Sequence, residues 1–67
     1  MENKKKYNKL LQRYYNGCEY LEKNPNDFHK YINNLLNIKK ELEETLIQIQ
    51  KEYGKITNAE ILEGFKV

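Results

Sequence analysis

Two helical stripes of apolar residues, separated by Asn24-Pro25-Asn26-Asp27, dominate this sequence. Apolar residues spaced three and four apart form one face of an α-helix, and this spacing predicts helices over about residues 3–22 and 25–53. A chain with two such helices and a turn between them buries both stripes by folding back on itself. We therefore expect an all-α, antiparallel two-helix hairpin. The stripes comprise Tyr7, Leu10, Leu11, Tyr14, Cys18 and Leu21, then Phe28, Tyr31, Ile32, Leu35, Ile38, Leu42, Leu46, Ile49 and Tyr53.

The residues at the turn carry signals for the start of the second helix. Asn24 is a typical N-cap, Pro25 suits the first helical position, and the carboxylate of Asp27 suits the first turn. Gly54 is a typical residue for the C-terminal stop. Folding the chain about residues 23–25 then predicts one specific register for the two helices.

This register places Gly17 opposite Tyr31 and Ile32, and Tyr7 opposite Leu42. Glycine inside a helix costs about 1 kcal/mol relative to alanine. We expect the role of Gly17 to be that it leaves room for the large side chain opposite.

A short third helix is predicted over about residues 58–63. Thr57 and Glu60 form a capping box, Ile56 can contact Ile61 across the start of the helix, and Gly64 ends it. Two roles remain open for the apolar residues of this tail, Ile61, Leu62 and Phe65. They cover the end of the second helix, which the first helix does not reach (Leu46, Ile49 and Tyr53), or they dock into a groove of a partner protein.

Self-association is expected because the chain is small. With 67 residues there is room for one domain, residues 1–67, whose core usually needs additional support. A single cysteine excludes an internal disulfide. A second apolar strip along one flank of the hairpin predicts a homodimeric four-helix bundle. Alternatively the tail or a foreign protein covers this strip, which consists of Leu11, Tyr15, Cys18, Ile32, Leu36, Leu46 and Ile47.

The charge is distributed unevenly. Residues 1–13 carry a net charge of +4, whereas residues 41–67 carry six glutamates against three lysines. The five cations near the start, here called the basic arm, allow an alternative function in binding DNA or RNA through phosphate contacts. The hairpin is expected to weaken this function by placing the arm beside Glu41, Glu43 and Glu44. The basic arm consists of Lys4, Lys5, Lys6, Lys9 and Arg13.

Catalytic and cofactor chemistry is not expected. The chain has no serine, and its single histidine, His29, and single cysteine, Cys18, do not form a metal set or a catalytic pair. We expect Cys18 to act as a small buried hydrophobe. No apolar run is long enough to span a membrane, and the basic start at Lys4 is not followed by the apolar stretch of a signal peptide. We therefore expect no membrane partner and a cytoplasmic location.

The composition and three short motifs indicate an origin. Lys, Asn, Ile and Tyr account for 32 of 67 residues, which indicates an AT-rich genome. The run Tyr14…Glu19…Asn26-Asp27-Phe28…Ile32 resembles the hairpin of the small histidine-kinase checkpoint inhibitor of sporulating bacilli. This resemblance implies a partner-facing role for Phe28. The apolar pattern alone instead places Phe28 at the turn end of the interface between the two helices.

Two further motifs point to the same bacteria. Lys40-Glu41-Leu42-Glu43 is similar to the Gln-Glu-Leu-Asp core of the small sporulation aspartyl-phosphate phosphatases, with Lys39 and Glu43 in place of their Ser and Asp. The tail Ile56-Thr57-x-x-Glu60-Ile61-Leu62-x-Gly64-Phe65 resembles uncharacterised small proteins of Gram-positive bacteria and their phages or mobile elements. These resemblances imply a source and a fold. The apolar strip and the lack of a catalytic set predict a small non-enzymatic regulatory or interaction module.

Overall fold

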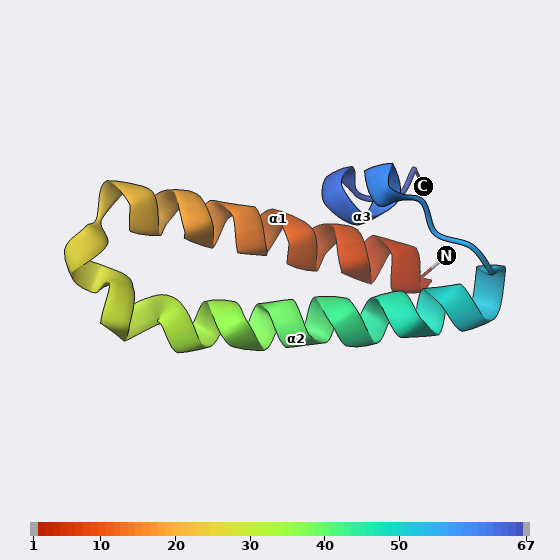
Figure 1. The fold of residues 1–67 in the computed structure, drawn as a ribbon, viewed down its shortest axis with the longest axis horizontal. Coiled ribbons are helices and arrows are strands. Elements are labelled where there is room, and N and C mark those ends of the chain that lie inside the picture. Colours follow the sequence, from red (N-terminus) through yellow and green to blue (C-terminus); the bar gives the residue numbers. More distant parts are fainter. Residues whose placement is uncertain (1, 67) are drawn as a thin grey trace.

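The computed structural model describes residues 2–66 as an all-helical chain. Its elements are α1 (Glu2–Lys23), the 3-10 turn η1 (Pro25–Asp27), α2 (Phe28–Tyr53) and α3 (Asn58–Glu63). α1 and α2 lie side by side and run in opposite directions, and α3 lies beside the first turns of α1 (Figure 1). The all-α prediction is confirmed.

The turn differs from the expectation for Asn24 and Asp27. Asn24 makes no side-chain capping bond to α2, because its backbone N–H and its Nδ2 both donate to Tyr20 O, each at 2.9 Å, and close the end of α1. Asp27 precedes α2 but likewise makes no capping bond, since its Oδ2 accepts a hydrogen bond from the Tyr20 hydroxyl at 2.6 Å. Pro25 begins the 3-10 turn, so α2 starts at Phe28 and not at residue 25.

The longer turn changes the register between the long helices. Gly17 faces Leu35, about one helical turn beyond the predicted Tyr31 and Ile32. A Cβ atom at position 17 would overlap Leu35 Cδ2, so the prediction that Gly17 makes room for a large side chain is confirmed with a different partner. The prediction that α1 does not reach the end of α2 is wrong, because Asn3 Nδ2 donates a hydrogen bond to Glu52 Oε1.

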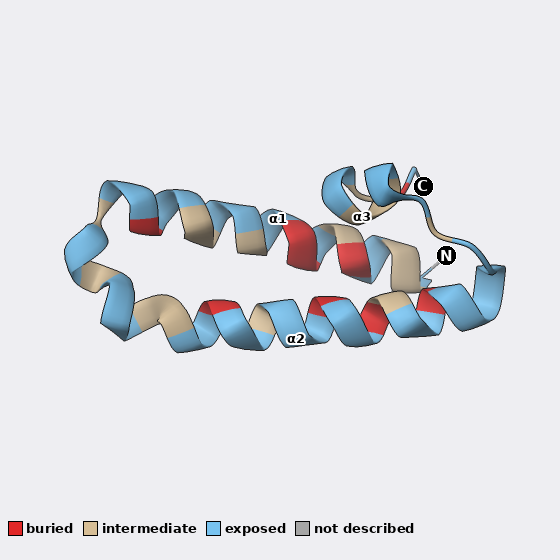
Figure 2. Ribbon diagram, viewed as in Figure 1, coloured by how far each residue is buried: buried red, intermediate tan, exposed pale blue. Residues whose placement is uncertain are grey.

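The core is concentrated in the half of the molecule that lies away from the turn. Its buried cluster contains residues from α1, α2 and the tail, which are Tyr7, Leu10, Leu11, Leu42, Ile49 and Phe65. In the half nearer the turn, Leu21 and Leu35 are the buried apolar side chains among the described residues (Figure 2). The turn half therefore consists of two packed helices with no third layer over them.

The predicted signals at the ends of α3 are confirmed. Thr57 Oγ1 accepts a hydrogen bond from the Glu60 N–H at 3.2 Å, and Glu60 Oε1 accepts one from the Thr57 N–H at 3.0 Å. These hydrogen bonds lower the pKa of Glu60, so its carboxylate is charged and able to accept at neutral pH. Gly54 and Gly64 end α2 and α3 with φ angles of +90° and +96°.

Candidate interaction surfaces

The tail is bound to α1 by hydrogen bonds from side chains to its backbone. The Tyr7 hydroxyl donates to Ile61 O at 2.6 Å, and the Tyr15 hydroxyl donates to Leu62 O at 2.6 Å. Asn8 binds both backbone groups of Phe65, since Nδ2 donates to Phe65 O at 2.8 Å and Oδ1 accepts from the Phe65 N–H at 2.7 Å. Two of the carbonyls at the end of α3, which lack partners within the helix, are thus satisfied by α1.

The three apolar residues of the tail have different positions. Phe65 is 6% exposed and its ring meets Tyr7 edge to face, with centroids 5.4 Å apart. Ile61 is half-buried, whereas Leu62 is 62% exposed. The Phe65 side chain therefore fills the core together with Ile49, which fits the covering role left open for the tail. Leu62 is the tail residue that presents an apolar side chain to the outside.

The tail also covers part of the predicted dimer strip. Leu11 is buried, and a Cβ atom on Gly64 would lie 3.8 Å from Leu11 Cδ2, so the end of α3 lies against it. Leu46 packs half-buried against the core cluster. Leu11 is therefore covered by the tail and is not part of an open face, whereas Leu46 is only partly buried. Cys18 and Ile32 are half-buried, and the exposed members of the strip are Tyr15, Leu36 and Ile47.

An open apolar groove lies between α1 and α2 in the turn half. Its volume is about 350 Å³, and Phe28 and Leu36 remain 45% and 54% exposed. Sequence periodicity assigned Phe28 to the turn end of the interface between the two helices, whereas the sporulation-inhibitor resemblance implied a partner-facing role. The structure places it on the wall of this groove. We name it the apolar groove, and it is lined by Tyr14, Cys18, Leu21, Glu22, Phe28, Ile32, Leu35 and Leu36.

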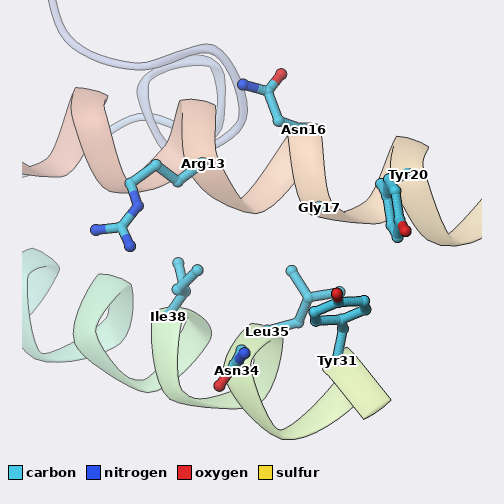
Figure 3. A pocket seen from close by; sticks show the side chains of 8 residues that line it. All are labelled: Arg13, Asn16, Gly17, Tyr20, Tyr31, Asn34, Leu35 and Ile38. Atoms are coloured by element: carbon cyan, nitrogen blue, oxygen red, sulfur yellow. The ribbon is translucent and has the colours of Figure 1, made fainter. Parts of the chain in front are cut away.

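A second groove was not predicted from the sequence. It has a volume of about 460 Å³ and combines an apolar floor with polar groups at its rim (Figure 3). The spacing of Arg13, Gly17 and Tyr20 along one face of α1 is the sequence signal that could have indicated it. We name it the arginine groove, and it is lined by Arg13, Asn16, Gly17, Tyr20, Tyr31, Asn34, Leu35 and Ile38.

The basic arm lies partly beside the acidic residues of α2. Lys6 lines a shallow hollow with Glu41 and Glu44, as the predicted hairpin required. None of the five cations forms an ion pair with a carboxylate of residues 2–66. The ion pair found in this part of the chain joins Lys23 to Glu19, at 3.0 Å, and lies outside the arm. Lys4 is half-buried, with Nζ 4.1 Å from the centroid of the Tyr53 ring. The four exposed members of the arm are Lys5, Lys6, Lys9 and Arg13.

The tyrosine hydroxyls act as hydrogen-bond donors over the ordinary pH range. The hydrogen bond that Tyr20 donates to Asp27 raises the Tyr20 pKa above its usual value of 10. Burial raises the pKa of Tyr7, and burial followed by the neighbouring Cys18 raises that of Tyr14. These hydroxyls therefore stay protonated at neutral pH, where Tyr20 donates to the turn and Tyr7 donates to the tail.

The reactive residue types do not assemble into a site within residues 2–66. His29 is exposed and contacts Phe28 edge to face at 5.7 Å between centroids, whereas Cys18 lines the apolar groove. No three His, Cys, Asp or Glu side chains in this part of the chain are placed to hold a metal ion. No helix among these residues is long and apolar enough to cross a membrane.

Comparisons with known proteins add no relationship to this geometry. No family model, curated protein or solved structure matches the chain. The sporulation and phage resemblances therefore stay predictions. The two grooves and the basic arm are the candidate functional surfaces of the described chain.

Proposed function

We propose that this chain is a non-enzymatic protein–protein interaction module and that it pairs with a second copy through the apolar groove. The observation that carries the proposal is the open groove itself, in which Phe28 and Leu36 leave large apolar side chains half exposed. Apolar surface that is gathered in one place is favourable to bury against another protein. The free thiol of Cys18 in this groove suits a reducing compartment such as the cytoplasm.

The uneven core supports a second copy as the partner. The tail provides a third layer over one half of the helix pair, and two more helices would provide it over the turn half as in a four-helix bundle. The molecule measures 41 × 18 × 17 Å, so one long side has a projected area of roughly 700 Å², and a second copy would have to cover most of that side to reach the ~800 Å² per partner of a standard interface. Exposed Tyr15 and Leu62 extend the apolar surface from the groove towards the tail.

Replacement of Leu36 by glutamate is expected to weaken the dimer by more than about tenfold, because a carboxylate would lose water in the interface. Asn37→Glu is the matched control, since Asn37 is also exposed on α2 but lines a separate hollow with Arg13 and Glu41. Sedimentation equilibrium of both variants measures the change. A wild-type chain that sediments as a monomer at tens of micromolar would overturn the proposal.

The Cys18 thiol gives a second readout of the same association without any substitution. Because Cys18 lines the apolar groove, a second copy would cover it, and its reaction with a disulfide reagent should slow as the protein concentration rises. In Leu36→Glu the rate should stay constant over the same range. If the thiol reacts at the same rate in both proteins at every concentration, the chain does not associate through the apolar groove.

A second candidate function is nucleic-acid binding by the basic arm. The observation in its favour is that Lys5, Lys6, Lys9 and Arg13 are exposed on α1 and form no ion pair with residues 2–66. Four phosphate contacts would lower the association constant with a slope of about −3 to −4 in log–log salt plots. Titration of duplex and single-stranded DNA at two salt concentrations measures this slope. Binding that is absent at low salt excludes this candidate.

A further inference from the structure

The arginine groove has an apolar floor formed by a buried Leu35 and a half-buried Ile38. Leu35 and Ile38 point from α2 towards α1, and Leu35 packs directly against Gly17 (Figure 3). The rings of Tyr20 and Tyr31 close the groove at the turn end, edge to face with centroids 5.5 Å apart. The floor can therefore accept an apolar or aromatic body of limited size.

The opposite end of the groove presents one charged group. Arg13 reaches from α1 towards α2 beside Ile38 (Figure 3). It forms no ion pair or hydrogen bond with the described residues, although Glu41 lines an adjoining hollow. An unpaired guanidinium binds carboxylates through two parallel hydrogen bonds.

The other polar groups near the groove leave the charge of Arg13 as the main determinant of which ligand can bind. The Tyr20 hydroxyl is already bonded to Asp27, and the Asn16 side chain points away from the groove and accepts a hydrogen bond from Gln12. Lys30 Nζ lies 5.3 Å from the centroid of the Tyr31 ring and adds positive charge near the turn end. Asn34 is the remaining polar residue of the lining, and the groove thus pairs the charge of Arg13 with an aromatic and aliphatic floor.

We propose that the arginine groove binds a small organic anion in which a carboxylate is joined by a short linker to an aromatic ring. The carboxylate pairs with Arg13, and the ring lies on Leu35 and Ile38 against Tyr31. The groove has a volume of about 460 Å³ and is largely open to solvent, so a small ligand would lie along its floor with one side exposed. This site shares Leu35 with the apolar groove, but Leu36 and Cys18 do not line it, so the two sites can be tested separately.

The test uses the full chain, isotopically labelled, and 3-phenylpropanoate as the probe. Saturable NMR shifts are expected at Gly17, Leu35 and Ile38, with a dissociation constant in the millimolar range typical of such small ligands. Arg13→Gln should weaken binding by about tenfold or more. Lys9→Gln, which removes an exposed charge of α1 outside the groove, should leave binding unchanged.

The neutral analogue 3-phenylpropanamide separates charge recognition from simple apolar contact. It should bind about tenfold more weakly than the carboxylate or not at all. Equal binding of the amide, an unaffected Arg13→Gln variant, equal weakening by Lys9→Gln, or shifts that never saturate would each overturn the proposal. Leu36→Glu should bind the probe as the wild type does, so failure of the dimer and failure of this site are distinguishable.

Discussion

Truncation of Phe65 to alanine is expected to lower the free energy of unfolding by about 3–5 kcal/mol, the range for removal of a buried phenylalanine. Phe65 is 6% exposed and contacts Tyr7 within the core cluster. A chain of this length has a total stability of roughly 3–10 kcal/mol, so the variant should be unfolded or close to it. Thermal denaturation followed by circular dichroism measures the loss, with an expected fall in Tm of more than about 10 °C.

Leu62→Ala is the matched control for this prediction. Leu62 belongs to the same tail and loses a similar apolar group, but it is 62% exposed, so its truncation should cost less than about 1 kcal/mol. A large difference between the two variants would show that the tail stabilises the fold through Phe65. Two equally small effects would mean that the tail is not part of the core.

Gly64→Ala is expected to destabilise the chain by about 2–4 kcal/mol for two separate reasons. The φ angle of +96° with an extended ψ strains any residue with a Cβ atom by about 1–3 kcal/mol. The added Cβ would also lie 2.7 Å from Asn8 Oδ1, which accepts the hydrogen bond of the Phe65 N–H. Asn8 would have to move and release the backbone of the tail.

Gly54→Ala isolates the first of these reasons. Its φ angle is +90°, but no atom lies within 4 Å of the position that a Cβ would take. Its cost should therefore be the strain alone, about 1–3 kcal/mol. The difference between the two variants, measured by chemical denaturation, gives the contribution of the Asn8 contact to tail docking. Equal losses in both variants would show that this contact contributes little.

The helices could be predicted because their signals are local. The three-and-four spacing of apolar residues places α1 and α2, and the Thr57 and Glu60 capping box places the start of α3. The turn was less predictable, since proline is tolerated both at the first position of an α-helix and in a 3-10 turn. That ambiguity moved the start of the second helix by three residues and changed the partner of Gly17 from Tyr31 and Ile32 to Leu35.

The surfaces could be predicted only in part because they depend on contacts that are distant in sequence. Periodicity identified Leu36 and Cys18, which line the apolar groove, but it also included Leu11, which the tail covers. Docking of the tail depends on side chains of Tyr7 and Asn8 that bind backbone groups more than fifty residues away. No helical period encodes such bonds, and the arginine groove likewise depends on how Leu35 and Ile38 of α2 meet α1.

The position of Phe65 in the core has a consequence for folding during synthesis. α1 and α2 can pair as soon as both have emerged, since a helical hairpin contains mainly short-range contacts. The core cluster around Tyr7, however, closes only when Phe65 arrives and Asn8 binds its backbone. A ribosome-bound chain that ends before this residue therefore exposes the core to water and to proteases. The final folding step takes place only after translation has passed Phe65.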